Sequence, residues 1–349
     1  MSDARESVAA RFDWQADWCA RLGSPLYADL MVRSARDIEA GGPVWAVLDG
    51  HERDSYESML QLRFAGAVHR LALSGRAPAL AARYPSTGGE GTPDGTWRAF
   101  RETVADRVHD LRELVELPVQ TNEVGRSRAL APGFMVAAAE TGLPLRLLEV
   151  GSSAGLNLRW DHFRYEADGW SAGDPESPVR FAGYFDGAAV PLVTEPARVA
   201  ERLGCDPSPV DAAGEDGALT LRSYLWADQL DRLRLLDAAL EVAGRVPARV
   251  ERARATDWLE ERLAQAAEGV CSIVFHSIVM QYVPEEERRR IDELLADAGA
   301  WATEAAPMAR LELEPAGEYA EVRLTLWPGG ERRVLARAGY HGTPVEWLG

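Results

Sequence analysis

The most informative absence in this sequence is lysine, since all 38 basic residues are arginine. Pyridoxal Schiff bases, class I aldolases, Walker A phosphate loops and protein kinases each need a lysine amine, for carbonyl attack or for phosphate binding. The sequence therefore excludes these classes of enzyme.

Cysteine and long apolar segments are also scarce. Cys19, Cys205 and Cys271 are far apart and form no CxxC pair, which argues against a disulfide framework, a zinc ribbon or a thioredoxin-like redox site. The histidines lack metal-ligand spacing, so we expect no built-in metal ion. The longest apolar stretch, residues 269–283, contains His276 and is too short and too polar to cross a bilayer. Because the N-terminus lacks the apolar core of a signal peptide, we expect a cytoplasmic protein without a membrane span.

Acidic side chains are in excess along the chain, with 55 acidic against 38 basic residues and a formal net charge of −17. A surface this negative repels phosphate backbones unless its bases cluster on one face, and we find no such cluster. We therefore expect no nucleic-acid partner. The 349 residues, 46% of them hydrophobic, suffice for one large or two ordinary folded domains. The sequence does not predict the oligomeric state.

Hydrophobic periodicity divides the chain into two parts. Residues 1–118 show apolar side chains at helical spacing, which predicts an all-helical N-terminal domain. In residues 119–349 apolar strands alternate with helices, which predicts an α/β domain with a mostly parallel sheet. Residues 169–218 are rich in Pro, Gly and Asp without a period, so we expect an excursion from the sheet after its second strand. The predicted strands are residues 145–150, 248–255, 270–276, 309–314, 321–327 and 332–338, the last two joined by a Pro-Gly-Gly hairpin, and the predicted helices include 226–243 and 285–298.

The first of these strands ends in an acid, Glu149, and opens through small residues toward a helix. Such a turn lets backbone amides approach a ligand closely, with the N-terminus of the helix behind them. The sequence therefore predicts a cofactor-binding loop at residues 151–155, with a tight turn that binds nothing as the alternative. A nicotinamide fingerprint fits poorly, because Ser153 stands at the position of its middle glycine.

The same residues also match the GxSxG nucleophile elbow of serine hydrolases. Ser153 would be the nucleophile, with Asp257 and His341 following in hydrolase order. A hydrolase sheet, however, needs several strands before the elbow, and helices are predicted there. The hydrolase is therefore the weaker alternative.

Glu149, Gly151 and Gly155 match the first motif of class I S-adenosylmethionine-dependent methyltransferases: an acid, any residue, glycine, three residues, glycine. Residues 255–259 resemble the methyltransferase segment whose acid contacts the adenine amine. Residues 272–284 look like the fourth strand and the loop that faces the sulfonium and the substrate. The resemblance implies a Rossmann-like methyltransferase fold with a C-terminal antiparallel hairpin, and S-adenosylmethionine as cofactor. The cofactor-binding residues that it implies are Glu149, Gly151, Ser152, Ser153, Gly155, Asn157, Glu166, Asp257, Trp258, His276 and Ser277.

Two features depart from the methyltransferase pattern. The acid that holds the ribose hydroxyls usually follows the glycines by about 20 residues, whereas Glu166 lies only 11 residues after Gly155. The Asn-Pro-Pro-Tyr loop of nucleotide methylases is replaced by His276-Ser277, which disfavours amino-group methylation of nucleic acid. Asp257 also has an alternative role as a helix N-cap.

Over nearly its full length the chain resembles a bacterial family known only as domain of unknown function 2332. The resemblance rests on three strings: QTNEVGRS at residues 120–127, GSSAGLNL at 151–158 and HGTPVEW at 341–347. It implies a methyltransferase-like fold and no particular substrate.

Methyl transfer from a sulfonium requires aligned donor and acceptor, and one base if the acceptor must lose a proton. His276, at the end of a buried strand, is the candidate base, with a core histidine that bonds a backbone carbonyl as the alternative. We hypothesise that Gln120, Asn122, Glu123 and Arg126 form a lid or substrate clamp, and that Tyr282 lines the substrate pocket. The predicted function is methylation of a small molecule, with a non-catalytic cofactor-binding or regulatory module as the alternative.

Overall fold

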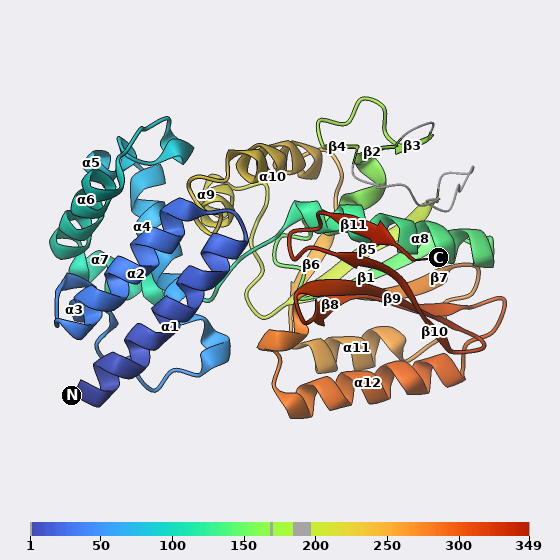
Figure 1. The fold of residues 1–349 in the computed structure, drawn as a ribbon. Helices are drawn as coiled ribbons and strands as arrows, with labels where there is room; N and C mark the ends of the chain where they lie inside the picture. The colour runs from blue at the N-terminus through green and yellow to red at the C-terminus, as the bar shows by residue number, and fades with distance from the viewer. Residues whose placement is uncertain (1, 168–169, 184–196, 349) are drawn as a thin grey trace. The chain divides into compact units, whose positions relative to one another are not determined.

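The computed structural model describes residues 2–167, 170–183 and 197–348, which form two compact units (Figure 1). One unit contains residues 1–121 and 215–234, and the other contains residues 122–214 and 235–349. Residues 215–234 thus belong to the helical unit, although the sequence-based division assigned them to the α/β domain. Among the described helices, none has the length and apolarity needed to cross a bilayer.

The first unit is built from helices. Ser24 caps α2 by accepting a hydrogen bond from the Tyr27 amide, and a proline occupies the first turn of that helix, where its missing N–H costs nothing. The helices are α1 (Ser2–Arg21), α2 (Pro25–Glu39), α3 (Pro43–Leu48), α4 (Leu60–Leu73), α5 (Pro78–Ala81), α6 (Pro93–Asp106), α7 (Val108–Val115) and α9 (Glu215–Ser223), with 3₁₀ turns η1 (Tyr56–Ser58) and η2 (Pro85–Thr87).

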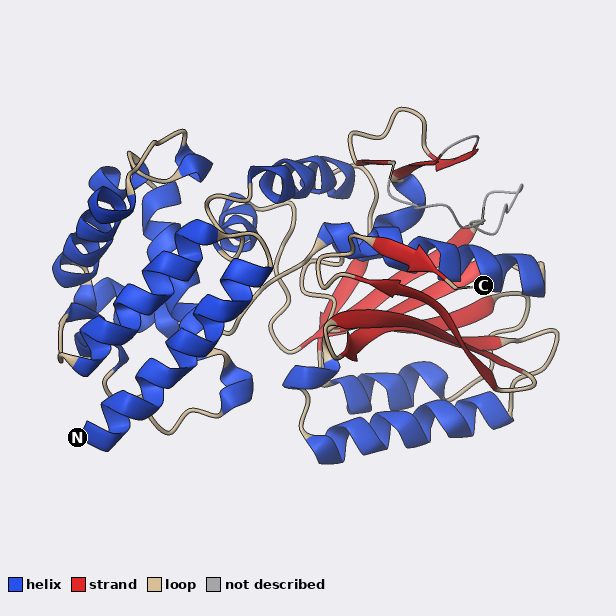
Figure 2. Cartoon of the chain, in the orientation of Figure 1, coloured by secondary structure: helices blue, strands red, loops and turns tan. Residues whose placement is uncertain are grey.

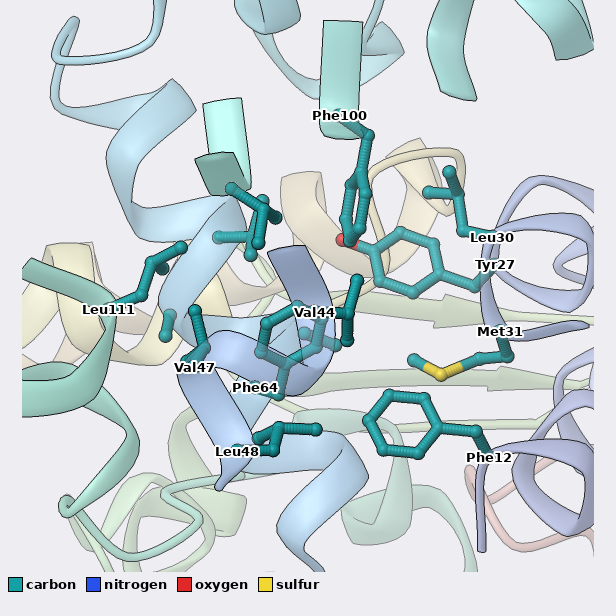
Figure 3. Packing of buried hydrophobic residues seen from close by; sticks show 14 of the residues in the cluster. Phe12, Tyr27, Leu30, Met31, Val44, Val47, Leu48, Phe64, Phe100 and Leu111 are labelled. Atoms are coloured by element: carbon teal, nitrogen blue, oxygen red, sulfur yellow. The ribbon is translucent and has the colours of Figure 1, made fainter. Parts of the chain in front are cut away.

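Aliphatic and aromatic side chains together fill the core of the helical unit (Figure 3). Phe64 makes edge-on contacts with Phe12 and Phe100, at ring-centroid distances of 5.8 and 6.0 Å. Trp226, from the inserted residues 215–234, stacks on Tyr27 at 6.1 Å. The insertion therefore completes this core, and the unit needs it to bury its apolar side chains.

The second unit is built on an eight-stranded sheet with the order β11-β10-β9-β8-β7-β1-β5-β6. Strands are drawn in red in Figure 2. Neighbours from β6 to β8 are parallel, and those from β8 to β11 are antiparallel, which includes the hairpin that the Pro-Gly-Gly turn predicted. The α/β class and the largely parallel sheet are thus confirmed. The strands are β1 (Leu145–Val150), β5 (Val199–Asp206), β6 (Arg249–Arg252), β7 (Cys271–Ser277), β8 (Met308–Ala316), β9 (Tyr319–Trp327), β10 (Glu331–Ala338) and β11 (Val345–Trp347).

Helices cover both faces of this sheet (Figures 1 and 2). On one face, Phe134 of α8 (Ser127–Thr141) stacks on Trp160 at 4.8 Å and meets the ring of Phe275 edge-on at 4.9 Å. On the other face, Val274 packs with side chains of α11 (Ala255–Leu263) and α12 (Glu285–Ala300). Alternation along β7 sends Phe275 and Val274 to opposite faces, so the strand is buried on both sides. The remaining helices are α10 (Leu230–Ala243), η3 (Val124–Arg126), η4 (Leu156–His162) and η5 (Met280–Tyr282).

The predicted excursion is only partly an excursion. Its described part contains β5, the strand that pairs with β1, so the second strand of the main sheet follows a shorter insertion. That insertion includes a separate small sheet of β3 (Trp170–Gly173), β2 (Arg164–Ala167) and β4 (Arg180–Ala182). Residues 169 and 184–196 of the predicted excursion lie outside the described residues.

Candidate functional site

The strand order contains one point at which the chain changes direction across the sheet. After β1, the chain adds β5 and β6 on one side, and then returns to add β7 and β8 on the other side. In open α/β sheets, ligands bind beyond the carboxyl ends of the strands at such a point. The candidate site therefore lies where β1 ends at Val150 and β7 ends at Ser277.

The glycine loop, residues 151–155, follows β1 directly. Gly151, Ser153 and Gly155 all have positive φ, at 67°, 52° and 65°. For a serine, this backbone conformation costs about 1–2 kcal/mol, and such strain concentrates at functional sites. Two hydrogen bonds fix Ser153: its amide donates to Oδ2 of Asp206 at 2.9 Å, and its carbonyl accepts from Val210 at 3.1 Å.

Four of the five amides of this loop are already occupied. Besides that of Ser153, those of Gly151 and Ser152 both donate to the carbonyl of Cys205, at 2.9 and 3.1 Å, and that of Gly155 donates to Ser152. The expected helix behind the loop is the short 3₁₀ helix η4, whose backbone is non-helical at Arg159. A phosphate-binding loop needs several free amides backed by the N-terminus of a regular helix, and this loop does not match that arrangement.

Asp206 is the functional candidate that the sequence analysis missed. It ends β5, is buried, and accepts the amide of Ser208 through Oδ1 at 2.8 Å in addition to that of Ser153. Glu166, the predicted ribose acid, lies on β2 of the small sheet and pairs with Arg164 and Arg180 at 3.0 and 3.1 Å. The acid at the end of the strand next to β1 is therefore Asp206 and not Glu166.

Glu149 lies near the end of β1, two residues before the first glycine of the loop, and is only 2% exposed. Its Oε2 atom has no hydrogen-bond partner among the described residues. Burial raises the pKa of this carboxyl well above its usual value, partly opposed by the positive charge of Arg159, while Asp206 adds to the increase. Arg159 donates to the carbonyl of Gly155 at 2.6 Å, and burial lowers its own pKa to about 10. A buried carboxyl, with one oxygen that no described residue hydrogen-bonds, thus lies two residues before the glycine loop.

The amide segment, residues 120–127, contacts the residues that follow the glycine loop. Asn122 accepts the amide of Leu156 at 2.9 Å, and Asn157 donates to the carbonyl of Glu123 at 3.3 Å. The hydroxyl of Ser127 donates to Asn157 at 2.7 Å. The predicted lid residues Asn122 and Glu123 therefore lie at the site, while Gln120 is a buried residue of the helical unit.

Arg126 links three parts of the chain at this edge of the sheet. Its guanidinium donates to the carbonyl of Ser277 at 2.8 Å and to that of Tyr340 at 3.2 Å. The segment that begins at His341 lies against Gly125, because a Cβ added to Gly125 would overlap the carbonyl of His341. Residues 122–127 of the first string thus meet the string at 151–158 and the start of the string at 341–347 here.

The turn after β7 also carries backbone strain. Ile278 has φ = 52°, which is rare for a β-branched residue. The next residue, Val279, lies against the glycine loop, since a Cβ added to Gly151 would be 2.6 Å from its Cγ1. Tyr282, the predicted pocket residue, is 39% exposed on η5. Strained residues therefore stand at the end of both strands that border the site.

His276 is fully buried, and both of its ring nitrogens face protein groups. Nδ1 lies 2.6 Å from Oε1 of Glu314, and Nε2 lies 3.5 Å from a guanidinium nitrogen of Arg310. His276 is thus a core residue, as in the alternative interpretation, but its partners are side chains and not a backbone carbonyl. They leave no ring nitrogen for a substrate proton in this conformation.

Asp257 and Trp258 follow β6, the outer parallel strand. Asp257 is exposed in the first turn of α11, and because the N-cap of that helix is Arg254, the N-cap role predicted for Asp257 is wrong. Trp258 is a core residue whose indole donates to Glu251 at 3.0 Å. The described residues contain no cluster of three or more His, Cys, Asp or Glu side chains that could bind a metal ion.

Comparison with known proteins yields one match. A family model described as an uncharacterized protein conserved in bacteria (DUF2332) matches residues 9–347. No curated protein and no solved structure matches the chain.

Proposed function

The chain belongs to this family of uncharacterised bacterial proteins, and from that premise we propose that its α/β unit binds S-adenosylmethionine and methylates a small molecule. We also propose that this unit is a variant of the class I methyltransferase fold. We place the protein in the cytoplasm, where its three buried cysteines stay free. One observation carries it: β1, beside which the sheet changes direction, and its neighbour β5 each carry a buried acid at or next to their last residue, Glu149 and Asp206.

The chemistry of these groups selects the kind of ligand. Four of the five amides of the glycine loop are occupied, so the loop has few donors for a pyrophosphate. The carboxyls supply acceptors instead: Oε2 of Glu149 is open, and each oxygen of Asp206 accepts one amide and keeps a further lone pair. A nucleoside that carries hydroxyl and ammonium groups but no phosphate fits this pattern, and a dinucleotide does not.

The residues have distinct roles in this proposal. Asp206 would hold the ribose hydroxyls, in place of the Glu166 expected from the sequence. Glu149 would face the amino-acid part of the ligand, beside Gly151. When bound, S-adenosylmethionine would supply a methyl group for transfer to a nucleophile of the acceptor, the carbon–sulfur bond breaking as the new bond forms and S-adenosylhomocysteine leaving. The amide segment and the turn at Ser277 would exclude water and align the acceptor, which is the main demand that such a reaction makes on a protein.

A calorimetric titration tests the proposal, using S-adenosylmethionine, S-adenosylhomocysteine and, as a control, NAD. We expect the first two to bind and NAD not to bind. Asp206→Asn keeps an acceptor for the Ser153 amide and should still weaken binding, because the amide loses the charge and one acceptor oxygen. Glu166→Gln is the matched control and should bind like the wild type. Equal loss in both variants would contradict the assignment of Asp206.

A serine hydrolase is the second candidate, because Ser153 has the positive φ of a nucleophile elbow in a matching GxSxG sequence. Asp257, the acid predicted for the catalytic triad of a hydrolase, is exposed on α11, the helix that follows the outer parallel strand β6. A fluorophosphonate probe separates the two functions, since labelling of Ser153 would support the hydrolase. A non-catalytic module would bind S-adenosylhomocysteine and transfer no methyl group.

A further inference from the structure

The turn after β7, residues 277–280, is fixed by one buried carboxylate. Oε1 of Glu314 lies 2.6 Å from Nδ1 of His276 and accepts the amides of Val279 at 3.1 Å and Met280 at 3.5 Å. Glu314 is 6% exposed and His276 is fully buried. The pair therefore connects the interior of the sheet to the backbone of the turn.

The backbone preferences of its own residues would not favour the conformation of this turn. Ile278 is in the left-handed region, which disfavours a β-branched side chain, so surrounding contacts must impose it. Those contacts are the Glu314 hydrogen bonds, the amide of Ile278 donating to Leu313 at 2.8 Å, and the guanidinium of Arg126 on Ser277 at 2.8 Å. The strain is thus maintained at the edge of the candidate site.

We propose that Glu314 and His276 are positioning residues, which hold the strained turn against the glycine loop and so set the geometry of the ligand site. The inference rests on the proposed function for the identity of the ligand. Val279 is the connection: its backbone is bound to Glu314, and its side chain lies against Gly151. His276 acts through Glu314 and touches no ligand, which replaces its predicted role as a base.

Other charged side chains lie beside the pair within the sheet. Arg310 lies 3.5 Å from Nε2 of His276 and pairs with Glu312 at 3.2 Å and with Asp292 of α12 at 2.6 Å. Glu312 also pairs with Arg332 at 3.1 Å. Glu312 thus has the same strand, charge and burial as Glu314 but no contact with the turn among the described residues, which makes it a matched control.

The first measurement compares Glu314→Gln with Glu312→Gln for binding of S-adenosylhomocysteine and for amide exchange at residues 279 and 280. Losing a buried, charge-assisted hydrogen bond should weaken binding by about ten- to hundredfold in Glu314→Gln. The two amides should exchange faster in that variant alone. Equal effects of the two substitutions, or unchanged exchange in Glu314→Gln, would overturn the proposal.

The second measurement concerns His276. His276→Asn places an amide donor near the position of the ring Nδ1, so it should retain more binding than His276→Ala. Equal loss in both variants would overturn the positioning role. If the wild type fails to bind S-adenosylhomocysteine, the proposed function is wrong, whereas amide exchange still decides whether Glu314 holds the turn.

Discussion

Substitution of Gly151 tests quantitatively whether the turn after β7 contacts the glycine loop. With φ = 67°, an alanine there would pay about 1–2 kcal/mol for the left-handed backbone. Its Cβ would also lie 2.6 Å from Cγ1 of Val279, and overpacking of this kind costs about 1–3 kcal/mol more. We therefore expect Gly151→Ala to lower the free energy of unfolding by about 2–5 kcal/mol.

Gly142 is the matched control for this substitution. It has the same φ of 67°, and a Cβ added there meets nothing within 4 Å. Gly142→Ala should therefore cost only the backbone part, about 1–2 kcal/mol. Urea unfolding followed by circular dichroism would measure both variants, and Val279→Ala should recover part of the Gly151→Ala loss in a double-mutant cycle. Equal costs at the two glycines would refute the contact between Val279 and the glycine loop.

Three further outcomes follow from buried groups of the same unit. Because burial raises the pKa of Glu149, its neutral form stabilises the folded protein below pH 4.5, and this stabilisation is lost as the pH rises toward the folded-state pKa. Glu149→Gln should therefore stabilise the protein at pH 8 and flatten this part of a curve of unfolding free energy against pH. Burial alone would raise the pKa of Glu314, but the hydrogen bond and charge of His276, together with the amides of Val279 and Met280, outweigh burial and lower the pKa. The stability that this carboxylate contributes is therefore present above pH 4.5 and lost as the pH falls below it, and Glu314→Gln should remove that loss in acid unfolding experiments. Phe134→Ala removes a fully buried ring between Trp160 and Phe275 and should cost about 3–5 kcal/mol in urea unfolding, against a smaller cost for Phe134→Leu.

Most strands that the sequence predicted correctly are buried on both faces or paired in a hairpin, and β6, a half-exposed edge strand, is the exception. β1 and β7 are short apolar runs whose side chains all meet protein, so composition alone indicates them. The turn between β9 and β10 is equally local, because Pro328 and the glycines after it favour a tight reversal. Local signals of this kind suffice to place Glu149, Gly151 and Ser277 at strand ends from the sequence alone.

β5 escaped prediction because half of it does not resemble a buried strand. Its first residues, including Glu201, are exposed, and only Leu203 to Asp206 are buried. Asp206 was missed with it, although an acid directly after a short apolar run repeats the pattern of Glu149 and could have been noticed. The role of His276 was beyond prediction for another reason: its partner Glu314 is 38 residues away in the chain and meets it only through strand pairing.

The helical unit shows a further limit of local patterns. Trp226 lies in a predicted helix of the second part of the chain, and nothing in its surroundings indicates that its ring stacks on Tyr27. Periodicity identifies the apolar face of a helix but not the partner that covers it.

A crystal structure of the protein grown with S-adenosylhomocysteine would show whether the α/β unit binds this nucleoside. We expect the nucleoside beyond the carboxyl ends of β1 and β7, with its ribose hydroxyls within hydrogen-bond distance of Asp206 and its amino-acid part beside Glu149 and Gly151. Density for the ligand elsewhere on the molecule, or none at saturating concentration, would contradict the proposed binding site.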